Sequence, residues 1–413
     1  MATTADSVYD VVVVGGSYAG LAVALGLART LGGSLELAVV ERRPMAPASA
    51  AGEPRAFAVS AGSRKLLDAL GVWAELDGLA QPVARIEITD SALEDSVRPV
   101  LLTYDNVVAG EAQTHIVEAT HLQRALVAAV LAEPSITIVA PATLDGLDQT
   151  PGSARLHLTD GRIIAGRLAI AADGARSRLR EAAGNATSNW RYGQTGIVTT
   201  VELEEDHGST AVQHFLPAGP FALLPLPGRR ACITWSEEEA RAAEILALGD
   251  DAFLAEAQQR AGWRLGALSL AGPRAGWPLE ARVTHSMTGR RLALVGDAAR
   301  SVHPVAGQGV NLGFRDVAAL VEVLADGLRL GLEPGDATVL ERYQRWRRFD
   351  GTQSALAFTT LNALFSRDWT LLRGIRGAGL GIVDRLPGLK QLLVAEAAGS
   401  TGEVPRLLEG ALP

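Results

Sequence analysis

The chain has 413 residues, of which 48% are hydrophobic and 20% are charged, and it carries a formal net charge of −8 at pH 7. These values are typical of a soluble globular protein longer than one ordinary domain, and the negative charge argues against nucleic acid as the main partner. The single cysteine, Cys232, excludes an intramolecular disulfide and a cysteine-based zinc site, which fits the reducing conditions of the cytoplasm. The sequence predicts no metal site.

The first apolar run, residues 11–28, is long enough to raise the question of a membrane span or a signal sequence. The ten residues before it include two acidic and no basic side chains, which is the wrong charge for a signal sequence, and glycines interrupt the run. A strand, a tight turn and a buried helix explain the segment better. The turn, Gly-Gly-Ser-Tyr-Ala-Gly, approximates the dinucleotide fingerprint G-x-G-x-x-G, whose glycines let a pyrophosphate approach a helix N-terminus.

Ser17 replaces the second glycine of this fingerprint. Its hydroxyl could bond a phosphate oxygen, but its Cβ narrows the approach of the backbone and weakens the motif taken alone. A second strand is expected over residues 35–40, and it ends at Glu41, which Arg42 follows. An acidic residue about twenty positions past the turn is where such folds hold the hydroxyls of an adenosine ribose. The two halves together therefore predict a dinucleotide site.

Two later segments carry strand and turn signals. Alternating residues within 81–105 predict short, half-buried strands, which we assign to a second sheet. An apolar run from Leu168 ends at Asp173, where a turn begins that contains Arg176, Arg178 and Arg180. Asp173 can anchor this turn while the arginines gather positive charge near a pyrophosphate. The alternative is a helix-capping turn with solvated arginines.

From residue 184 to about 281, strand-like runs dominate. They predict a mostly antiparallel sheet that forms a substrate chamber. Five apolar side chains of this segment could line a pocket, although each alone is more often part of a core. They are Phe215, Phe221, Leu223, Pro225 and Trp235.

The rest of the chain is organised around residues 291–320. An apolar run ends at Gly296 and Asp297, so a lone carboxylate stands just past the C-terminal end of an expected strand, where open α/β sheets bind ligands. A glycine-rich loop and an amphipathic helix from Gly313 follow. Such a loop lets a flat or anionic ligand approach main-chain N–H groups, with a helix N-terminus behind it. The loop contains His303, Pro304, Gly307, Gln308, Gly309 and Asn311.

This stretch also carries a family resemblance. The string Gly-Asp-Ala-Ala, followed by His-Pro-Val-Ala-Gly-Gln-Gly-Val-Asn-Leu-Gly-Phe-Arg-Asp, resembles the signature of the flavin-dependent aromatic hydroxylases with the para-hydroxybenzoate hydroxylase-like fold. It is most similar to the ubiquinone-biosynthesis monooxygenase branch. The resemblance covers nearly the whole chain and implies FAD as the cofactor. It places Asp297 at the FAD ribitol and the loop over residues 307–311 against the isoalloxazine ring.

The resemblance also implies roles for earlier motifs. Arg55 would reach the cofactor pyrophosphate, where a guanidinium suits a bidentate contact. A polar residue at Gln123 or Arg124 would contact the flavin or its phosphates, and we favour Gln123. The turn at Asp173 resembles the motif D-G-x-x-S-x-x-R, which is associated with FAD and with transient contact to NAD(P)H, the implied reductant. The cofactor-binding residues expected in total are Gly15, Gly16, Ser17, Gly20, Glu41, Arg42, Arg55, Gln123, Asp173, Gly296, Asp297, Pro304, Gly307, Gln308, Gly309, Val310 and Asn311.

The order of elements and the resemblance together predict an α/β chain, α+β overall. A doubly wound FAD-binding domain is expected from residues 1–75, 106–183 and 282–350, with an inserted β-rich substrate domain from residues 76–105 and 184–281. Residues 351–413 are expected to form a C-terminal helical region. Its mixture of apolar and basic side chains could rest on the inner face of a membrane, contact a partner in a biosynthetic complex, or pack as a helical layer on the FAD domain.

The activity implied is that of an FAD-dependent monooxygenase, which uses O2 to hydroxylate the ring of a polyprenylated phenol on the way to ubiquinone. This chemistry requires no catalytic side chain. His303 could assist deprotonation of the phenol, but the family makes it a structural residue near the flavin. Two alternatives stay open. One is hydroxylation of a soluble aromatic compound, and the other is a non-catalytic flavoprotein subunit of a biosynthetic complex, for which Ser17 is the hint.

Overall fold

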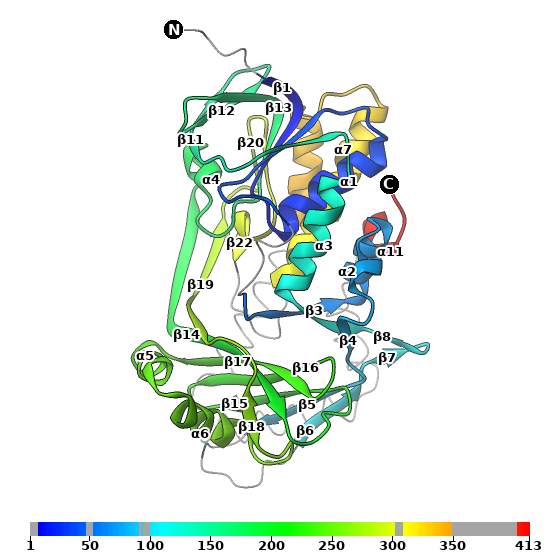
Figure 1. The fold of residues 1–413 in the computed structure, drawn as a ribbon. Helices are drawn as coiled ribbons and strands as arrows, with labels where there is room; N and C mark the ends of the chain where they lie inside the picture. Colours follow the sequence, from blue (N-terminus) through cyan, green and yellow to red (C-terminus); the bar gives the residue numbers. More distant parts are fainter. Residues whose placement is uncertain (1–6, 47–52, 91–92, 94–99, 302–308, 349–402) are drawn as a thin grey trace.

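The computed structural model describes residues 7–46, 53–90, 93, 100–301, 309–348 and 403–413. Two large β-sheets lie one above the other in Figure 1, and the long strands β14 (Thr187–Leu203) and β19 (Ala275–Thr284) join them along one side. Helices cover the upper sheet, and two more lie beneath the lower sheet. The α/β fold class expected from the sequence is confirmed.

The upper sheet has a parallel centre, in the order β10-β2-β1-β13. The other edge of β13 pairs with the antiparallel β12 in its first half and with the parallel β21 in its second half. Residues 11–14 are all valine and buried, as expected for a strand that is covered on both faces. The strands are β1 (Ser7–Val14), β2 (Leu37–Val40), β10 (Ile136–Val139), β11 (Leu144–Gln149), β12 (Ala154–Leu158), β13 (Ile163–Ala171), β20 (Thr288–Gly289) and β21 (Leu292–Leu294).

Three long helices pack on this sheet: α1 (Tyr18–Leu31), α3 (Ala119–Leu131) and α7 (Gly309–Arg329). Helix α1 contacts both of the others. A Cβ at Gly26 of α1 would lie 2.8 Å from Cγ2 of Val321 in α7, so a larger residue there would push the two helices apart. This close packing brings the N-terminal ends of α1 and α7 to the same edge of the sheet.

The lower sheet is mostly antiparallel, in the order β22-β19-β14-β17-β16-β15-β5-β6, and β18 also pairs with β14. The antiparallel sheet predicted for residues 184–281 is therefore present. Helices α5 (Glu239–Ala247) and α6 (Asp250–Ala261) cover its outer face. The remaining strands are β5 (Arg85–Asp90), β6 (Val100–Asp105), β15 (Thr210–Leu216), β16 (Gly219–Leu226), β17 (Arg230–Glu238), β18 (Leu268–Leu270) and β22 (Arg300–Ser301).

A third sheet corrects one expectation. We assigned all strands within residues 81–105 to the second sheet, but only β5 and β6 join it, whereas β4 (Ala80–Pro82) pairs with β9 (Thr114–Glu118) beside β3 (Ala56–Ser60). Alternation identifies a half-buried strand but not its partner, which distant parts of the chain decide. The nearby elements are α2 (Ala61–Ala69), η2 (Trp73–Leu76), β7 (Val107–Val108) and β8 (Glu111–Ala112). The domain boundaries given above stay a prediction.

The C-terminal end of the chain packs on the helices of the upper part. Helix α11 (Arg406–Glu409) lies against α2 and α7, and its Leu407 is buried. Arg406 pairs with Glu322 and Asp326 of α7. Of the helical region expected over residues 351–413, the last eleven residues contain one short helix that packs on α2 and α7, and residues 351–402 lie outside the described part. Among the described helices, none is both long and apolar enough to cross a membrane.

Candidate functional site

The glycine turn between β1 and α1 consists of positions that a side chain would block. Gly15 has a φ of +114°, and a Cβ there would lie 2.3 Å from the carbonyl oxygen of Ala172. A Cβ at Gly20 would lie 1.9 Å from the carbonyl oxygen of Gly15. Only glycine therefore fits at either position. The turn brings the first N–H groups of α1 to the C-terminal edge of the sheet, where an anion can bind.

Ser17 does not have to be glycine. Its backbone is extended, with φ −109° and ψ −170°, a conformation that any residue can adopt. It is the N-cap residue of α1, but its side chain makes no capping hydrogen bond and is half-buried. The departure from the fingerprint therefore imposes no backbone strain. Ser17 is no structural argument against a bound dinucleotide.

Glu41 and Gln123 meet at Gly16 from two different elements. The Glu41 carboxylate, just after β2, accepts a hydrogen bond of 2.7 Å from the N–H of Gly16. The Gln123 side chain, on α3, donates one of 2.7 Å to the carbonyl oxygen of Gly16. The side-chain oxygen of Gln123 is buried and has no partner among the described residues, so a ligand could satisfy it. Arg42 and Arg124 are both exposed, and this geometry favours Gln123 over Arg124.

The second half of the site is the turn after β21, which contains the short helix η3 (Gly296–Ala298). Gly296 has a φ of +61°, and a Cβ there would lie 3.1 Å from the Cβ of Ala19 in α1. A Cβ on Gly313 of α7 would lie 3.4 Å from the Cα of Gly296. Because both positions lack side chains, the turn fits between the N-terminal ends of α1 and α7. The two glycine-rich motifs, although distant in sequence, therefore form one site.

Asp297 projects its carboxylate from this turn. The side chain is accessible to solvent, yet the surrounding protein removes enough water to raise the pKa of the carboxyl group above its ordinary value. The guanidinium of Arg55 lowers this pKa, and the carboxylate of Asp316 raises it. A ligand can therefore reach this carboxylate, although protein atoms crowd around it. No described residue donates a hydrogen bond to Asp297, so its oxygens can accept from ligand hydroxyls.

Arg55 lies close enough to Asp297 to act on its charge, and it stands just before β3. Its guanidinium forms a bidentate ion pair with Glu53, with Nε–Oε1 2.7 Å and Nη2–Oε2 3.0 Å. It also lies 5.1 Å from the ring centroid of Trp277 and 5.8 Å from that of Phe57. The ring of Tyr18 contacts that of Phe57 edge-on, at 4.9 Å between centroids. Sequence reasoning missed these three aromatic residues, although Tyr18 and Phe57 are close neighbours of motif residues.

The turn after β13 is held by Asp173. One oxygen of its carboxylate accepts hydrogen bonds from the N–H groups of Arg178, at 2.8 Å, and Leu179, at 3.3 Å, at the start of α4 (Arg178–Ala182). Burial raises the pKa of Asp173. Its other oxygen is buried without a partner among the described residues. Asp173 thus anchors the turn, as expected.

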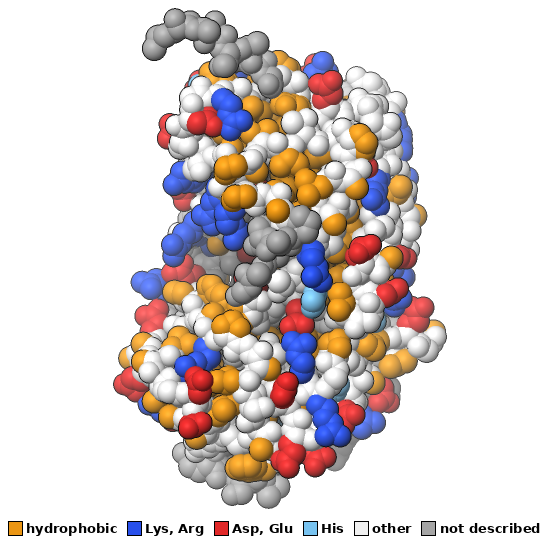
Figure 2. Space-filling model, in the orientation of Figure 1, with side chains coloured by type: hydrophobic (Ala, Val, Ile, Leu, Met, Phe, Trp, Pro, Cys, Tyr) orange, Lys and Arg blue, Asp and Glu red, His pale blue; other side chains and the backbone are white. Residues whose placement is uncertain are grey.

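The three arginines of this turn do not converge, so that expectation was wrong. Arg180 is buried and donates to the carbonyl oxygen of Ala298 at 3.0 Å, which ties this turn to the Asp297 turn. Arg178 donates to a carbonyl oxygen of β11, and Arg176 is exposed. Arg178 and Arg180 are two positions apart in α4 and therefore point to nearly opposite sides, whereas Arg176 precedes the helix. Figure 2 shows basic side chains over α4 and the adjoining ends of β14 and β19.

The glycine-rich loop is described only from its end. His303, Pro304, Gly307 and Gln308 lie outside the described residues. Gly309 begins α7, and a Cβ there would meet no atom within 4 Å; the next residue, Val310, is half-buried. The buried side chain of Asn311 donates to the carbonyl oxygen of Ala58 at 2.8 Å and accepts from the N–H of Ser60 at 3.0 Å. It therefore holds the start of α7 to β3, which uses one donor and one acceptor of its amide.

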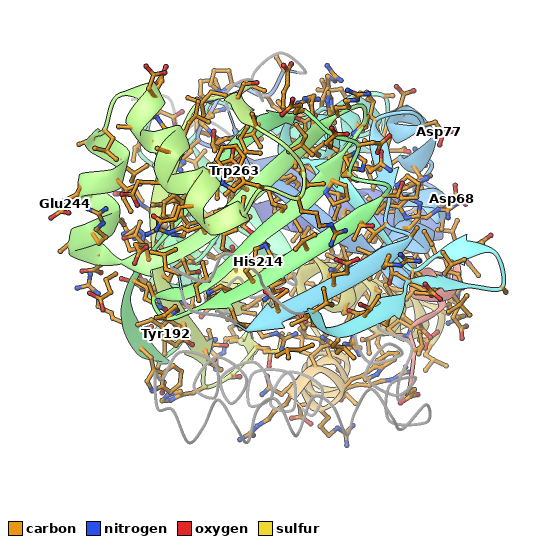
Figure 3. The ribbon with its side chains drawn as sticks, turned by 90° about the horizontal axis from the view of Figure 1, so that it is seen from below. Asp68, Asp77, Tyr192, His214, Glu244 and Trp263 are labelled. Carbon is orange, nitrogen blue, oxygen red and sulfur yellow. The ribbon has the colours of Figure 1, made fainter. Side chains whose placement is uncertain are left out.

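The faces of the lower sheet decide which side chains can line a chamber. Phe221, Leu223 and Trp235 belong to the outer core beneath α5 and α6, and alternation places Pro225 with them. These four are core side chains, which the sequence favoured for each of them taken alone, and they do not line a chamber. Phe215 alternates with His214, which lies on the outer face that Figure 3 shows, so Phe215 faces inward. Strand β16 is buried along its whole length, and its sequence therefore could not indicate which face points to the cofactor.

The comparisons with known proteins agree with this geometry. A family model described as an FAD binding domain matches residues 8–355. The ubiquinone hydroxylase UbiL of Rhodospirillum rubrum is 38% identical over 98% of this chain and 94% of that protein. The chain belongs to the ubiquinone-biosynthesis FAD monooxygenase family. The 3-demethoxyubiquinol 3-hydroxylase of Escherichia coli is 35% identical to this monooxygenase, over 94% of this chain and 98% of that protein.

A solved structure shows the same fold for this monooxygenase. The p-nitrophenol 4-monooxygenase of Pseudomonas putida superposes with a TM-score of 0.80 at 18% identity, and the match covers 97% of this chain and 100% of that one. The chain is thus an FAD-dependent aromatic-ring monooxygenase. Its residues fit FAD, because the glycines leave a cradle that any Cβ would fill. Gln123 and Asp297 also present acceptors without donors among the described residues.

Proposed function

We propose that this monooxygenase hydroxylates the aromatic ring of a polyprenylated phenol in ubiquinone biosynthesis. The observation that carries the proposal is its 38% identity with a ubiquinone hydroxylase over 98% of the chain. The similar identity with a 3-demethoxyubiquinol 3-hydroxylase supports the same class of substrate. The substrate in both names is a substituted ring with a prenyl tail, which calls for an apolar chamber beside the flavin.

In this proposal FAD lies across the C-terminal edge of the upper sheet. The pyrophosphate binds at the N-terminus of α1, where Arg55 still has Nη1 for a phosphate oxygen because Glu53 engages only Nε and Nη2. Glu41 holds the adenosine ribose with the acceptor capacity that its bond to Gly16 leaves. Asp297 accepts hydrogen bonds from the ribitol, and the start of α7 faces the isoalloxazine ring.

FAD supplies the activation of O2 and the transfer of oxygen to the ring. The protein binds, orients and keeps water out. The rings of Phe57 and Trp277 form an apolar wall beside Arg55, and a dry site strengthens each polar contact to the cofactor. Burial raises the pKa of Tyr18 to about 12, so its hydroxyl, which is neutral at pH 7 even with an ordinary pKa, also stays neutral in alkaline solution.

NAD(P)H is the reductant that we propose, and it docks at the arginines beside α4. Arg176 and Arg178 are exposed there, and Arg282 of β19 reaches the carbonyl oxygen of Ala175 in the same turn. Arg180 is turned inward, but the exposed guanidinium groups on this surface can each contact a phosphate of a nicotinamide dinucleotide. Arg176→Ala should raise the KM for NADH or NADPH about tenfold and leave FAD content unchanged. Unaltered reduction kinetics would favour a partner reductase instead.

We further propose that the protein is cytoplasmic and rests on the inner face of the membrane, because a polyprenylated substrate resides in lipid. Residues 361–390 combine leucine, phenylalanine and tryptophan with arginine and lysine, a composition that suits an anionic lipid surface or a partner in a biosynthetic complex. Cosedimentation with vesicles containing anionic lipid tests this. Binding that does not depend on anionic lipid would contradict the electrostatic part of the proposal.

The experiment that tests the function uses a bacterial strain without its ubiquinone ring hydroxylases. Expression of this chain should restore ubiquinone, and mass spectrometry should show one demethoxy or deoxy precursor disappear. The precursor that is lost identifies the ring position. If every precursor persisted while the purified protein was yellow with bound flavin, the quinone assignment would fail, and soluble aromatic compounds would be the next substrates to screen.

A further inference from the structure

Asp316 lies in α7 at the end of the signature string, but its side chain does not reach the surface where Asp297 is exposed. Its side chain is 0% exposed. One carboxylate oxygen, Oδ2, accepts a hydrogen bond of 3.2 Å from the N–H of Gly296. The other, Oδ1, accepts from Nε of Arg347 at 2.8 Å and from Nη2 of Arg300. Asp316 therefore connects a buried cluster of charges to the turn that carries Asp297.

The bond to Gly296 acts at the place that directs Asp297. Two other buried side chains hold the same region: Tyr343 donates to the carbonyl oxygen of Leu294 at 2.7 Å, and Arg180 donates to that of Ala298 at 3.0 Å. Neither of these two bonds involves the peptide group between Val295 and Gly296. The Asp316 bond fixes the plane of this peptide, which is one of the two planes that the positive φ of Gly296 relates, and so restrains the direction in which the next residue, Asp297, leaves the turn.

We propose that Asp316 is a positioning residue of the cofactor site, which orients Asp297 toward the FAD ribitol through the N–H of Gly296. The inference rests on the role proposed for Asp297. A charged acceptor makes a stronger hydrogen bond than a neutral one, and the two guanidinium groups on Oδ1 keep the carboxylate from rotating away. When Asp316 is removed, the chain still carries Asp297, but the Asp297 carboxylate should no longer point toward the ligand.

The test is a double-mutant cycle on FAD affinity, with apo-protein titrated by the fluorescence of FAD. Asp316→Asn has the same volume, but its amide cannot accept from both Gly296 and two guanidinium groups. We expect its Kd for FAD to rise about tenfold in the wild-type background. In the Asp297→Ala background the same change should alter the Kd less than about twofold, because the residue through which Asp316 acts is gone.

A matched control separates positioning from general loss of stability. Tyr343→Phe removes a buried hydrogen bond to Leu294 of β21, the strand that leads into the Gly296 turn. It should therefore lower the melting temperature and leave the Kd for FAD within about twofold of the wild-type value. Hydrogen exchange of the apo-protein gives a second readout. The Gly296 amide should exchange faster in Asp316→Asn and not in Tyr343→Phe. If Asp316→Asn does not fold, Asp316→Glu keeps the charge but shifts the carboxylate, and it should weaken FAD binding with a smaller loss of stability.

The outcomes separate the two assignments. If Asp297→Ala binds FAD as the wild type does, the ribitol assignment fails, and the inference about Asp316 fails with it. If Asp297→Ala loses FAD while Asp316→Asn loses only melting temperature, Asp316 is structural and only this inference is overturned. An equal effect of Asp316→Asn in both backgrounds would mean that it acts by another route, which also overturns the inference.

Discussion

The side chain of Gln123 donates a hydrogen bond of 2.7 Å to the carbonyl oxygen of Gly16, although 107 positions separate the two residues. The bond joins α3 to the glycine turn and leaves the other end of the amide, an acceptor, buried without a partner among the described residues. A buried acceptor without a donor costs free energy, so a ligand that brings a donor gains affinity there.

Gln123→Ala should therefore weaken FAD binding. The loss of a hydrogen bond at a buried site is worth about 1 to 2 kcal/mol, so we expect the Kd to rise between about fivefold and thirtyfold. Arg124→Ala, on the exposed side of the same helix, is the matched control and should change the Kd less than about twofold. Titration of apo-protein with FAD measures both. A larger effect of Arg124→Ala would reverse the choice between the two residues.

The backbone at Gly15 and Ser17 makes opposite predictions for two small substitutions. Gly15→Ala adds a Cβ at positive φ and against a carbonyl oxygen, so it should cost about 3 kcal/mol of stability or more and abolish FAD binding. Ser17→Gly should cost at most about 1 kcal/mol, mainly through a more flexible unfolded chain, and leave FAD affinity unchanged. Thermal denaturation and FAD titration report the two effects. A tenfold gain in affinity for Ser17→Gly would mean that the serine does obstruct the pyrophosphate.

The raised pKa of Asp297 predicts how the apo-protein responds to pH. The folded state holds this proton more tightly than the unfolded chain does. The resulting stabilisation is complete below the ordinary aspartate pKa of about 3.9, and it is lost as the pH rises through the raised value. At pH 7 the ionised group destabilises the apo-protein, so Asp297→Asn should raise its melting temperature there and not at pH 3. The control variant Asp68→Asn, at an exposed position, should not raise the melting temperature at pH 7.

The same carboxyl group predicts a pH dependence of cofactor binding. Ribitol hydroxyls donate to the ionised carboxylate, so FAD affinity should fall as the pH drops through the raised pKa of Asp297, above the range of an ordinary aspartate. In Asp297→Asn the affinity should be lower at neutral pH and flat over this range, and Asp297→Ala should purify with little FAD. Fluorescence titrations with FAD between about pH 4 and about pH 8 measure this affinity, because that interval covers the values that raised carboxyl pKa values usually take. A flat wild-type profile, or full flavin content in Asp297→Ala, would remove Asp297 from the site.

Gly309→Val separates the fold from the ligand. No described atom lies within 4 Å of a Cβ at Gly309, so the apo-protein should keep its melting temperature to within a few degrees. A branched side chain at the start of α7 should intrude on the flavin ring, so hydroxylation should be lost. Melting of the apo-protein and turnover of the FAD-loaded protein are the two measurements. Wild-type turnover would contradict the position proposed for the ring.

Some of this arrangement depends only on residues close together in the chain. The strand, turn and helix around Gly15, the acid at the end of β2 and the carboxylate after β21 are set by local periodicity and turn chemistry. The helix-capping role of Asp173 is also local, because its partners are the N–H groups of Arg178 and Leu179. The string that ends at Asp316 was long enough to indicate the family before any contact was known. These features were therefore predictable from the sequence.

Other features were decided only by tertiary structure. Strand β16 is buried on both faces, so its sequence holds no signal for the face that carries Phe221, and only the packing of α6 decides it. The two hydrogen bonds of Asn311 reach residues of β3 that lie 251 and 253 positions earlier in the chain. The bond of Asp316 to Gly296 requires α7 to fold back onto the end of β21. The sequence by itself determined which residues are candidates for the cofactor site, because their turns and strand ends are local, whereas long-range packing determined which of the described candidates are open to a ligand and which hold other elements in place.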